Sequence, residues 1–186
     1  MIEQKKVDEF YSKKWKSNIH LFRYSGTNLI KEVSDLNPAL VIDAGCGLNF
    51  FKGKIPNVVG FDPVFNEADI KCTIMTAPFK DACADVIFAF GSVNFGTRDD
   101  IANHLIKLKS WLKPKGRLYM RGAPDGYDDG LKWFQWGVKE INYFAELVGF
   151  KLIRIQVEHN ETGTIKERLF PHRYVWVYQR PEITND

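Results

Sequence analysis

The chain has 186 residues, a length typical of one domain, and 45% of them are hydrophobic, which is enough to bury a core without disulfides or metals. Lys and Arg number 26 against 23 Asp and Glu, and this net charge of +3 does not by itself indicate a polyanionic partner. The three cysteines form no C-x-x-C pair, so they exclude a disulfide framework and a zinc site and indicate reduced thiols in the cytoplasm. The opening residues are too polar for a signal peptide and no apolar run is long enough to cross a bilayer, so no membrane partner is expected.

The first 38 residues predict helices. Val7, Phe10 and Tyr11 recur at helical spacing within residues 3–16, with lysines on the opposite face, and a second helix is expected to end at Pro38. Two interpretations of this basic, aromatic opening remain. It is either an amphipathic helix packed on the edge of a sheet or a lid that covers a ligand site.

Two short apolar runs joined by a glycine-rich turn come next. The first run, residues 40–44, leads into Gly45 and Gly47, and the second run, residues 58–62, ends in Asp62. This is the layout of a nucleotide-binding βαβ unit, in which glycines let a ligand lie against bare backbone and the acid accepts hydrogen bonds from both ribose hydroxyls. The alternative is an ordinary α/β turn with an acid on the surface.

The residues of the turn discriminate between nucleotides. A dinucleotide site requires G-x-G-x-x-G, and Phe50 occupies the third glycine position; the chain also has no G-x-x-x-x-G-K-[ST] run for a nucleoside triphosphate. Asp43, directly before the turn, would repel a pyrophosphate and attract a cation. The pattern Asp43-x-Gly45-x-Gly47, followed by Asp62, resembles the first two motifs of the class I S-adenosylmethionine-dependent methyltransferases.

The resemblance implies a set of contacts to S-adenosylmethionine. Asp43, Gly45, Gly47 and Asn49, which stands where many family members have a third glycine, would hold the methionine end, and Asp62 would hold the ribose. The adenine would lie among three further residues: Pro63, Thr73 and Ile74. Thr73 stands where the family often has an acid, and a hydroxyl accepts a hydrogen bond more weakly than a carboxylate.

Residues 86–90 form a near-continuous apolar run, as expected for a central strand buried on both faces. Ligands in open α/β sheets bind at the carboxyl ends of strands, so Phe90 and Gly91 would form the floor of the pocket and Asn94 would contact the acceptor. The chain reads Ser-Val-Asn-Phe here, without the paired prolines of the amino-directed nucleic-acid methyltransferases. A nucleic-acid acceptor is therefore only weakly supported, by the N-terminal lysines and the modest positive charge.

The remaining segments follow the same family pattern. A helix is expected over residues 99–112, a strand over 116–122, a helix ending at Gly149, and strands over 151–157 and 174–178 as a closing hairpin. The loop 123–130 is either a solvated connector or an acceptor-binding loop with Tyr127, and His172 is a candidate base or acceptor contact. The aromatic residues 133, 134 and 136 are either core and wall or a cage for substrate.

We therefore expect one α/β domain over residues 1–186, with N-terminal helices or a lid in 1–38 and the sheet in 39–180. The resemblance implies a Rossmann-like class I methyltransferase sandwich: a mostly parallel seven-strand sheet of order 3-2-1-4-5-7-6, with a very short third strand and an antiparallel last strand. It also implies methyl transfer, without a metal, from S-adenosylmethionine to an unidentified acceptor, a small molecule rather than nucleic acid, yielding S-adenosylhomocysteine. The alternative is a non-catalytic module that binds either compound and needs a partner. No catalytic base is assigned, because an activated methyl group requires mainly alignment with its acceptor. The sequence does not indicate an oligomeric state.

Overall fold

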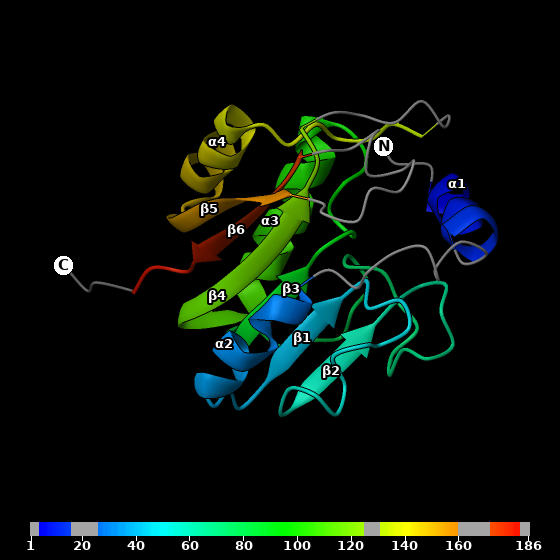
Figure 1. The fold of residues 1–186 in the computed structure, drawn as a ribbon. Coiled ribbons are helices and arrows are strands. Elements are labelled where there is room, and N and C mark those ends of the chain that lie inside the picture. The colour runs from blue at the N-terminus through cyan, green and yellow to red at the C-terminus, as the bar shows by residue number, and fades with distance from the viewer. Residues whose placement is uncertain (1–3, 16–25, 125–130, 160–171, 183–186) are drawn as a thin grey trace.

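The structure, a computed structural model, describes residues 4–15, 26–124, 131–159 and 172–182. These residues form an α/β sandwich around a six-stranded sheet of order β2-β1-β3-β4-β6-β5 (Figure 1). The strands are β1 (Val41–Ala44), β2 (Val58–Phe61), β3 (Ala84–Ala89), β4 (Leu112–Gly122), β5 (Lys151–His159) and β6 (His172–Gln179). The first four are parallel, and β6 is antiparallel to both β4 and β5. The predicted fold class and the antiparallel last strand are confirmed.

The predicted count of seven strands is wrong by one, because the third strand is reduced to a single bridge between Phe61 and Ile70. Ile70 accepts from the N–H of Asp62 at 3.1 Å and donates to the carbonyl of Gly60 at 3.2 Å. The ladder extends no further, since the N–H of Gly60 bonds to the carboxylate of Asp69 instead of a backbone carbonyl. The other six strands keep the predicted order.

The helices cover both faces of the sheet. The chain begins with α1 (Gln4–Glu9), which passes into a π-helical turn (Phe10–Trp15), and a 3₁₀ turn (Thr27–Leu29) leads into α2 (Ile30–Asp35). The longer helices are α3 (Arg98–Trp111) and α4 (Val138–Val148). Figure 1 shows α2 in front of the sheet and α3 behind it. No helix in the described part of the chain has the length and apolar character needed to cross a bilayer.

Alternation along the strands divides the core in two. Ile42, Ile87 and Leu118 pack with the buried faces of α3 and α4, whereas Val41 and Phe88 pack with α2. Because β1 and β3 are buried on both faces, their sequences are apolar except for Asp43 and Asp85, in agreement with the residue pattern. The polar residues that remain buried are therefore informative, and most of them lie where β1 and β2 end.

Candidate functional site

The glycine turn after β1 is held against the ends of two neighbouring strands. Gly45 and Gly47 have φ angles of +73° and +54°, the left-handed region that favours glycine. The N–H groups of Gly45 and Cys46 donate to the carbonyl of Phe61 at 2.9 and 3.0 Å, which fixes the turn to β2. On the other side, Ser92 donates its hydroxyl to the carbonyl of Ala44 at 2.6 Å. The turn is therefore a bare-backbone cradle at the carboxyl edge of the sheet.

Asp43 lies immediately below this cradle and is only 5% exposed. No hydrogen-bond donor among the described residues bonds to its carboxylate. Burial, and secondly the negative charge of Asp62, raise the pKa of Asp43 to about 7. A buried carboxylate in this position is stabilised by an incoming cation, because the cation supplies the opposite charge that the protein interior lacks.

Asp62, at 7% exposure, joins the glycine turn to the segment that follows β2. Its Oδ1 accepts from the N–H groups of Val64 and Phe65 at 2.7 and 3.0 Å, and its Oδ2 accepts from Gly47 at 3.1 Å. An ionised carboxylate has about four acceptor positions, so roughly one remains. The capacity for bonds to both ribose hydroxyls, expected from the sequence, is thus reduced to about one.

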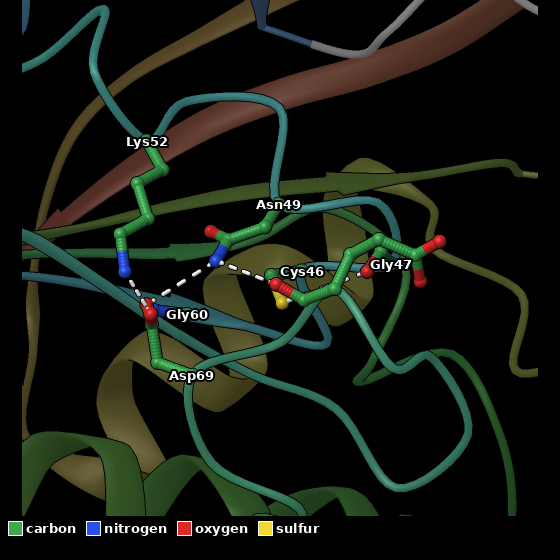
Figure 2. A network of polar contacts seen from close by, with 7 residues as sticks. Cys46, Gly47, Asn49, Lys52, Gly60 and Asp69 are labelled. Carbon is green, nitrogen blue, oxygen red and sulfur yellow. Dashed lines mark hydrogen bonds and ion pairs between the residues drawn. The ribbon is translucent and has the colours of Figure 1, made fainter.

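Asn49 turns its side chain toward the segment that follows β2 (Figure 2). Its φ of +55° is the left-handed conformation that a glycine would adopt there, and asparagine tolerates it. Its amide nitrogen donates to the Glu67 carbonyl at 3.1 Å and to Asp69 Oδ2 at 3.2 Å, and Lys52 forms an ion pair with the same carboxylate. The amide nitrogen is used within the protein and Oδ1 is buried without a partner, so a contact to a ligand would come from the backbone of Asn49.

The three residues expected around adenine have different surroundings. Pro63 is half-buried and Ile74, at 5% exposure, belongs to the core. The hydroxyl of Thr73 lies 3.1 Å from that of Thr76 and is engaged within this turn. Sequence reasoning missed Cys72, whose pKa is raised by burial and then by the charge of Asp62, so its thiol lies within electrostatic reach of that carboxylate.

Phe90 and Gly91 lie at the end of β3 but face different neighbours. The Phe90 ring packs on Phe88, and a Cβ added to Gly26 would lie 2.5 Å from its Cε2, so Phe90 is part of the wall on the α2 side. The Gly91 carbonyl accepts from the hydroxyl of Tyr11 at 3.4 Å. Gly91 therefore lies under the N-terminal segment.

The acceptor candidates are only partly brought together. Asn94 is half-buried, and its side-chain nitrogen donates to the Arg121 carbonyl at 3.5 Å. The backbone carbonyl of Asn94 accepts from the N–H of Phe134 at 2.8 Å. Tyr127 lies outside the described residues. His172 is the first residue of β6, paired with His159 beyond the end of β4, and only its backbone is described.

The N-terminal segment lies on the side of the sheet toward which the β1 and β2 arrows point (Figure 1). Its rings join an aromatic cluster made of Phe10, Tyr11, Phe95 and Trp133. The only indication of this cluster in the sequence was the helical spacing of Phe10 and Tyr11.

Among the aromatic residues predicted as core or cage, Trp136 is fully buried and donates Nε1–H to the Val93 carbonyl at 3.1 Å, so it is core.

Within the ranges that the structure describes, no group of three or more His, Cys, Asp and Glu side chains is arranged to hold a metal ion. Cys46, Cys72 and Cys83 are free thiols. The polar groups at the strand ends are thus two buried carboxylates, a bare glycine turn and the serine that touches it.

The fold is that of the class I S-adenosylmethionine-dependent methyltransferases. The chain is similar to the 1,6-didemethyltoxoflavin N1-methyltransferase of Burkholderia thailandensis bound to its substrate and S-adenosylhomocysteine, with a TM-score of 0.73 and 14% identity over 95% of this chain and 87% of that one. It is also similar to the magnesium protoporphyrin IX methyltransferase of Synechocystis PCC 6803 with bound S-adenosylhomocysteine (TM-score 0.68, 13% identity, 94% and 97% covered). A third similar structure is the [4+2]-cyclase SpnF (TM-score 0.62, 14% identity, 83% and 79% covered). No model of a known family and no curated protein matches the sequence.

Proposed function

We propose that this protein transfers a methyl group from S-adenosylmethionine to a small-molecule acceptor. The observation that carries the proposal is the buried Asp43 carboxylate, without a donor among the described residues, beneath a turn in which a Cβ on Gly45 would collide with Ser92. The methionine end of the cofactor is cationic at both its sulfonium and its ammonium, so the charge and the bare backbone suit it. One protein with this fold is a cyclase, so the reaction is argued from the site rather than from the fold.

Each part of the site has a proposed task. Asp43 attracts the cationic end, directly or through water, and the turn from Gly45 to Gly47 lets the ligand lie on main chain. The remaining acceptor position of Asp62 takes a ribose hydroxyl, and Pro63 with the 73–76 turn borders the adenine. Phe90 and Gly91 border the end of the site where the methyl group is transferred.

When bound, S-adenosylmethionine supplies a methyl group that is already activated for displacement. The protein then has to hold the acceptor in line and exclude water, and this positioning provides most of the rate advantage. The N-terminal segment over Gly91 suits the second task. The whole chain, residues 1–186, is taken as one methyltransferase domain acting in the cytoplasm, which the three free thiols support.

Calorimetric titration with S-adenosylmethionine and with S-adenosylhomocysteine tests the cofactor site. Wild-type protein should bind both, and Asp43→Asn should bind S-adenosylmethionine at least several-fold more weakly. Asp35→Asn removes an exposed carboxylate on α2 that pairs with Lys31, and it should bind like the wild type. Equal affinities of all three proteins would remove Asp43 from the site.

Transfer of labelled methyl to an acceptor tests the reaction itself. Cofactor binding without turnover across a broad set of small acceptors would favour the alternative, a non-catalytic module that needs a partner. Binding of single-stranded nucleic acid that falls steeply with salt would instead favour a nucleic-acid acceptor, because the slope reports released counterions.

A further inference from the structure

The aromatic cluster is a closed cycle of ring contacts between two distant parts of the chain. Phe10 and Tyr11, the lid pair, come from the π-helical turn, and Phe95 and Trp133, the rim pair, come from the segments after β3 and before α4. The ring centroids are 5.3 Å apart for Phe10–Tyr11, 5.7 Å for Phe10–Trp133, 5.9 Å for Tyr11–Phe95 and 4.4 Å for Phe95–Trp133. The two contacts between the pairs are edge-to-face, at 84° and 88°.

The rim pair is fixed by backbone bonds. Phe95 and Trp133 form an antiparallel bridge, flanked by a bond from the Gly96 N–H to the Lys132 carbonyl at 3.1 Å. Directly beyond it, the Phe134 N–H donates to the Asn94 carbonyl at 2.8 Å. Two aromatic rings are therefore held in place by backbone bonds, and Tyr11, which packs on Phe95, links them to Gly91 at the proposed methyl-transfer end of the site.

The lid pair is attached more loosely. The helix that precedes it, α1, has no buried residue, and both lid rings are half-buried. The hydroxyl of Tyr11 reaches the Gly91 carbonyl at 3.4 Å, near the long limit of a hydrogen bond. π-helical turns such as this one are frequent at functional sites. A third ring would offer similar contacts, so it can take the place of the edge-to-face contacts between lid and rim.

A polar residue, Asn94, directly precedes Phe95 in the chain. The side chain of Asn94 is half-buried, and while its amide nitrogen donates to the Arg121 carbonyl, its Oδ1 accepts from no donor among the described residues. A carboxamide oxygen without a donor can accept a hydrogen bond from a ligand that carries an O–H or N–H group. We call the contact between the lid pair and the rim pair the aromatic seam. One acceptor oxygen and two pairs of rings suit one small ring better than a polymer.

We infer that the acceptor is a small planar aromatic or heteroaromatic molecule with an O–H or N–H group, bound between the lid pair and the rim pair. Its ring packs on Phe95 and Trp133, and its donor bonds to Asn94 Oδ1. This inference rests on the proposed methyl transfer. In that step a lone pair of the acceptor oxygen or nitrogen forms the bond to the methyl carbon, the methyl–sulfur bond breaks with its electron pair going to sulfur, and the acceptor proton passes to water.

Fluorine NMR of protein labelled with 5-fluorotryptophan tests the aromatic seam. The chain has five tryptophans, and Trp111, Trp136 and Trp176 are fully buried and serve as internal references. The Trp133 signal is assigned with Trp133→Phe. With S-adenosylhomocysteine present, 2-naphthol should shift the Trp133 signal in a saturable way, and its saturated analogue decahydro-2-naphthol should not. Equal shifts, or no saturable shift with either compound, would overturn the inference.

A second comparison tests the role of Asn94. 2-Naphthol should bind several-fold more tightly than 2-methoxynaphthalene, which cannot donate, and this difference should vanish in Asn94→Leu. A difference that persists in the variant would remove Asn94 from the site.

Calorimetry with S-adenosylhomocysteine on the same samples separates the acceptor inference from the proposed function. If that compound binds while Trp133 stays silent, the acceptor inference fails and the cofactor site stands; if it does not bind, the proposed function itself fails. A Trp133 shift seen only with a single-stranded oligonucleotide would overturn the inference in favour of a polymeric acceptor.

Discussion

Gly45 and Ser92 touch across the ends of β1 and β3, so that a Cβ added to Gly45 would lie 2.7 Å from Cβ of Ser92. The same glycine has a φ of +73°, so a side chain there is both strained and obstructed. This contact brings the segment that follows the central strand against the turn proposed to hold the cofactor. We therefore expect a change at either residue to disturb both the glycine turn and the segment after β3.

Gly45→Ala should destabilise the protein and weaken cofactor binding. The left-handed backbone alone costs about 1–2 kcal/mol for a residue with a Cβ, and the contact with Ser92 adds to it. Gly53→Ala is the matched control, since Gly53 has a φ of +77° but no heavy atom within 4 Å of the added Cβ. Urea unfolding should show a larger loss for position 45 than for position 53. Similar losses would mean that Ser92 moves aside without cost.

Asp43 should make the binding of S-adenosylmethionine dependent on pH. With a pKa of about 7 in the free protein, the carboxylate is about one-tenth ionised at pH 6 and about nine-tenths ionised at pH 8. If only the ionised form attracts the cationic methionine end, affinity should rise roughly tenfold between these two values. Calorimetry at both pH values measures this rise, and Asp43→Asn should abolish it. A flat profile in the wild type would contradict the assigned charge contact.

The same raised pKa should lower the stability of the free protein. The folded-state pKa of about 7 exceeds the ordinary value of 3.8, so the unfolded chain releases its proton first and stability falls as pH rises from about 4 to about 7. The difference of about 3 pKa units sets an upper bound of roughly 4 kcal/mol at pH 8.

Asp43→Asn should therefore be more stable than the wild type at pH 8, with the advantage disappearing toward pH 4. Comparing the two proteins by urea unfolding at each pH cancels the contributions of other groups, such as Glu32 and Asp85, whose pKa values are lowered. A variant that gains stability yet loses the cofactor would identify Asp43 as a residue kept for function at the expense of stability. Equal stabilities at pH 8 would show that the buried carboxylate costs nothing.

The network around Asp69 should depend on its carboxylate more than on its surface lysine. Asp69→Ala leaves the Gly60 N–H without its acceptor, removes one of the two acceptors of the Asn49 amide nitrogen, and should cost about 1–3 kcal/mol. Lys52, whose side chain is 54% exposed, should contribute less than about 1 kcal/mol through its ion pair. Urea unfolding of the two single variants and of the double variant measures both terms. A larger loss from Lys52→Ala than from Asp69→Ala would contradict this order.

Patterns local to one segment predicted much of the fold. The apolar β-branched runs that became β1, β2 and β3 are buried as expected, and Gly149 ends α4 with a φ of +72°. The turn motif also indicated which strand ends would meet. These features follow from backbone geometry and burial within a few residues of sequence, so a single sequence contains them.

Relationships between distant residues were not predictable in the same way. That Asp62 would spend three acceptor positions on backbone N–H groups, and that Asn49 would turn toward Glu67 and Asp69, depends on how two loops fold together. The missing third strand has the same origin, since a side-chain carboxylate replaced a strand as the partner of Gly60. The contact of Tyr11 with Gly91 joins residues 80 positions apart, and no local pattern indicates it.

That replacement has a consequence for how the molecule meets its surroundings. With the third strand reduced to one bridge, β2 is left at the border of the sheet, where exposed backbone N–H groups would recruit a strand from another chain. Here the Asp69 carboxylate occupies the N–H of Gly60, and the charged Lys52 lies beside it. We therefore expect the pair to oppose edge-to-edge aggregation, so that the fold lacks a third strand without exposing an edge that pairs with another chain.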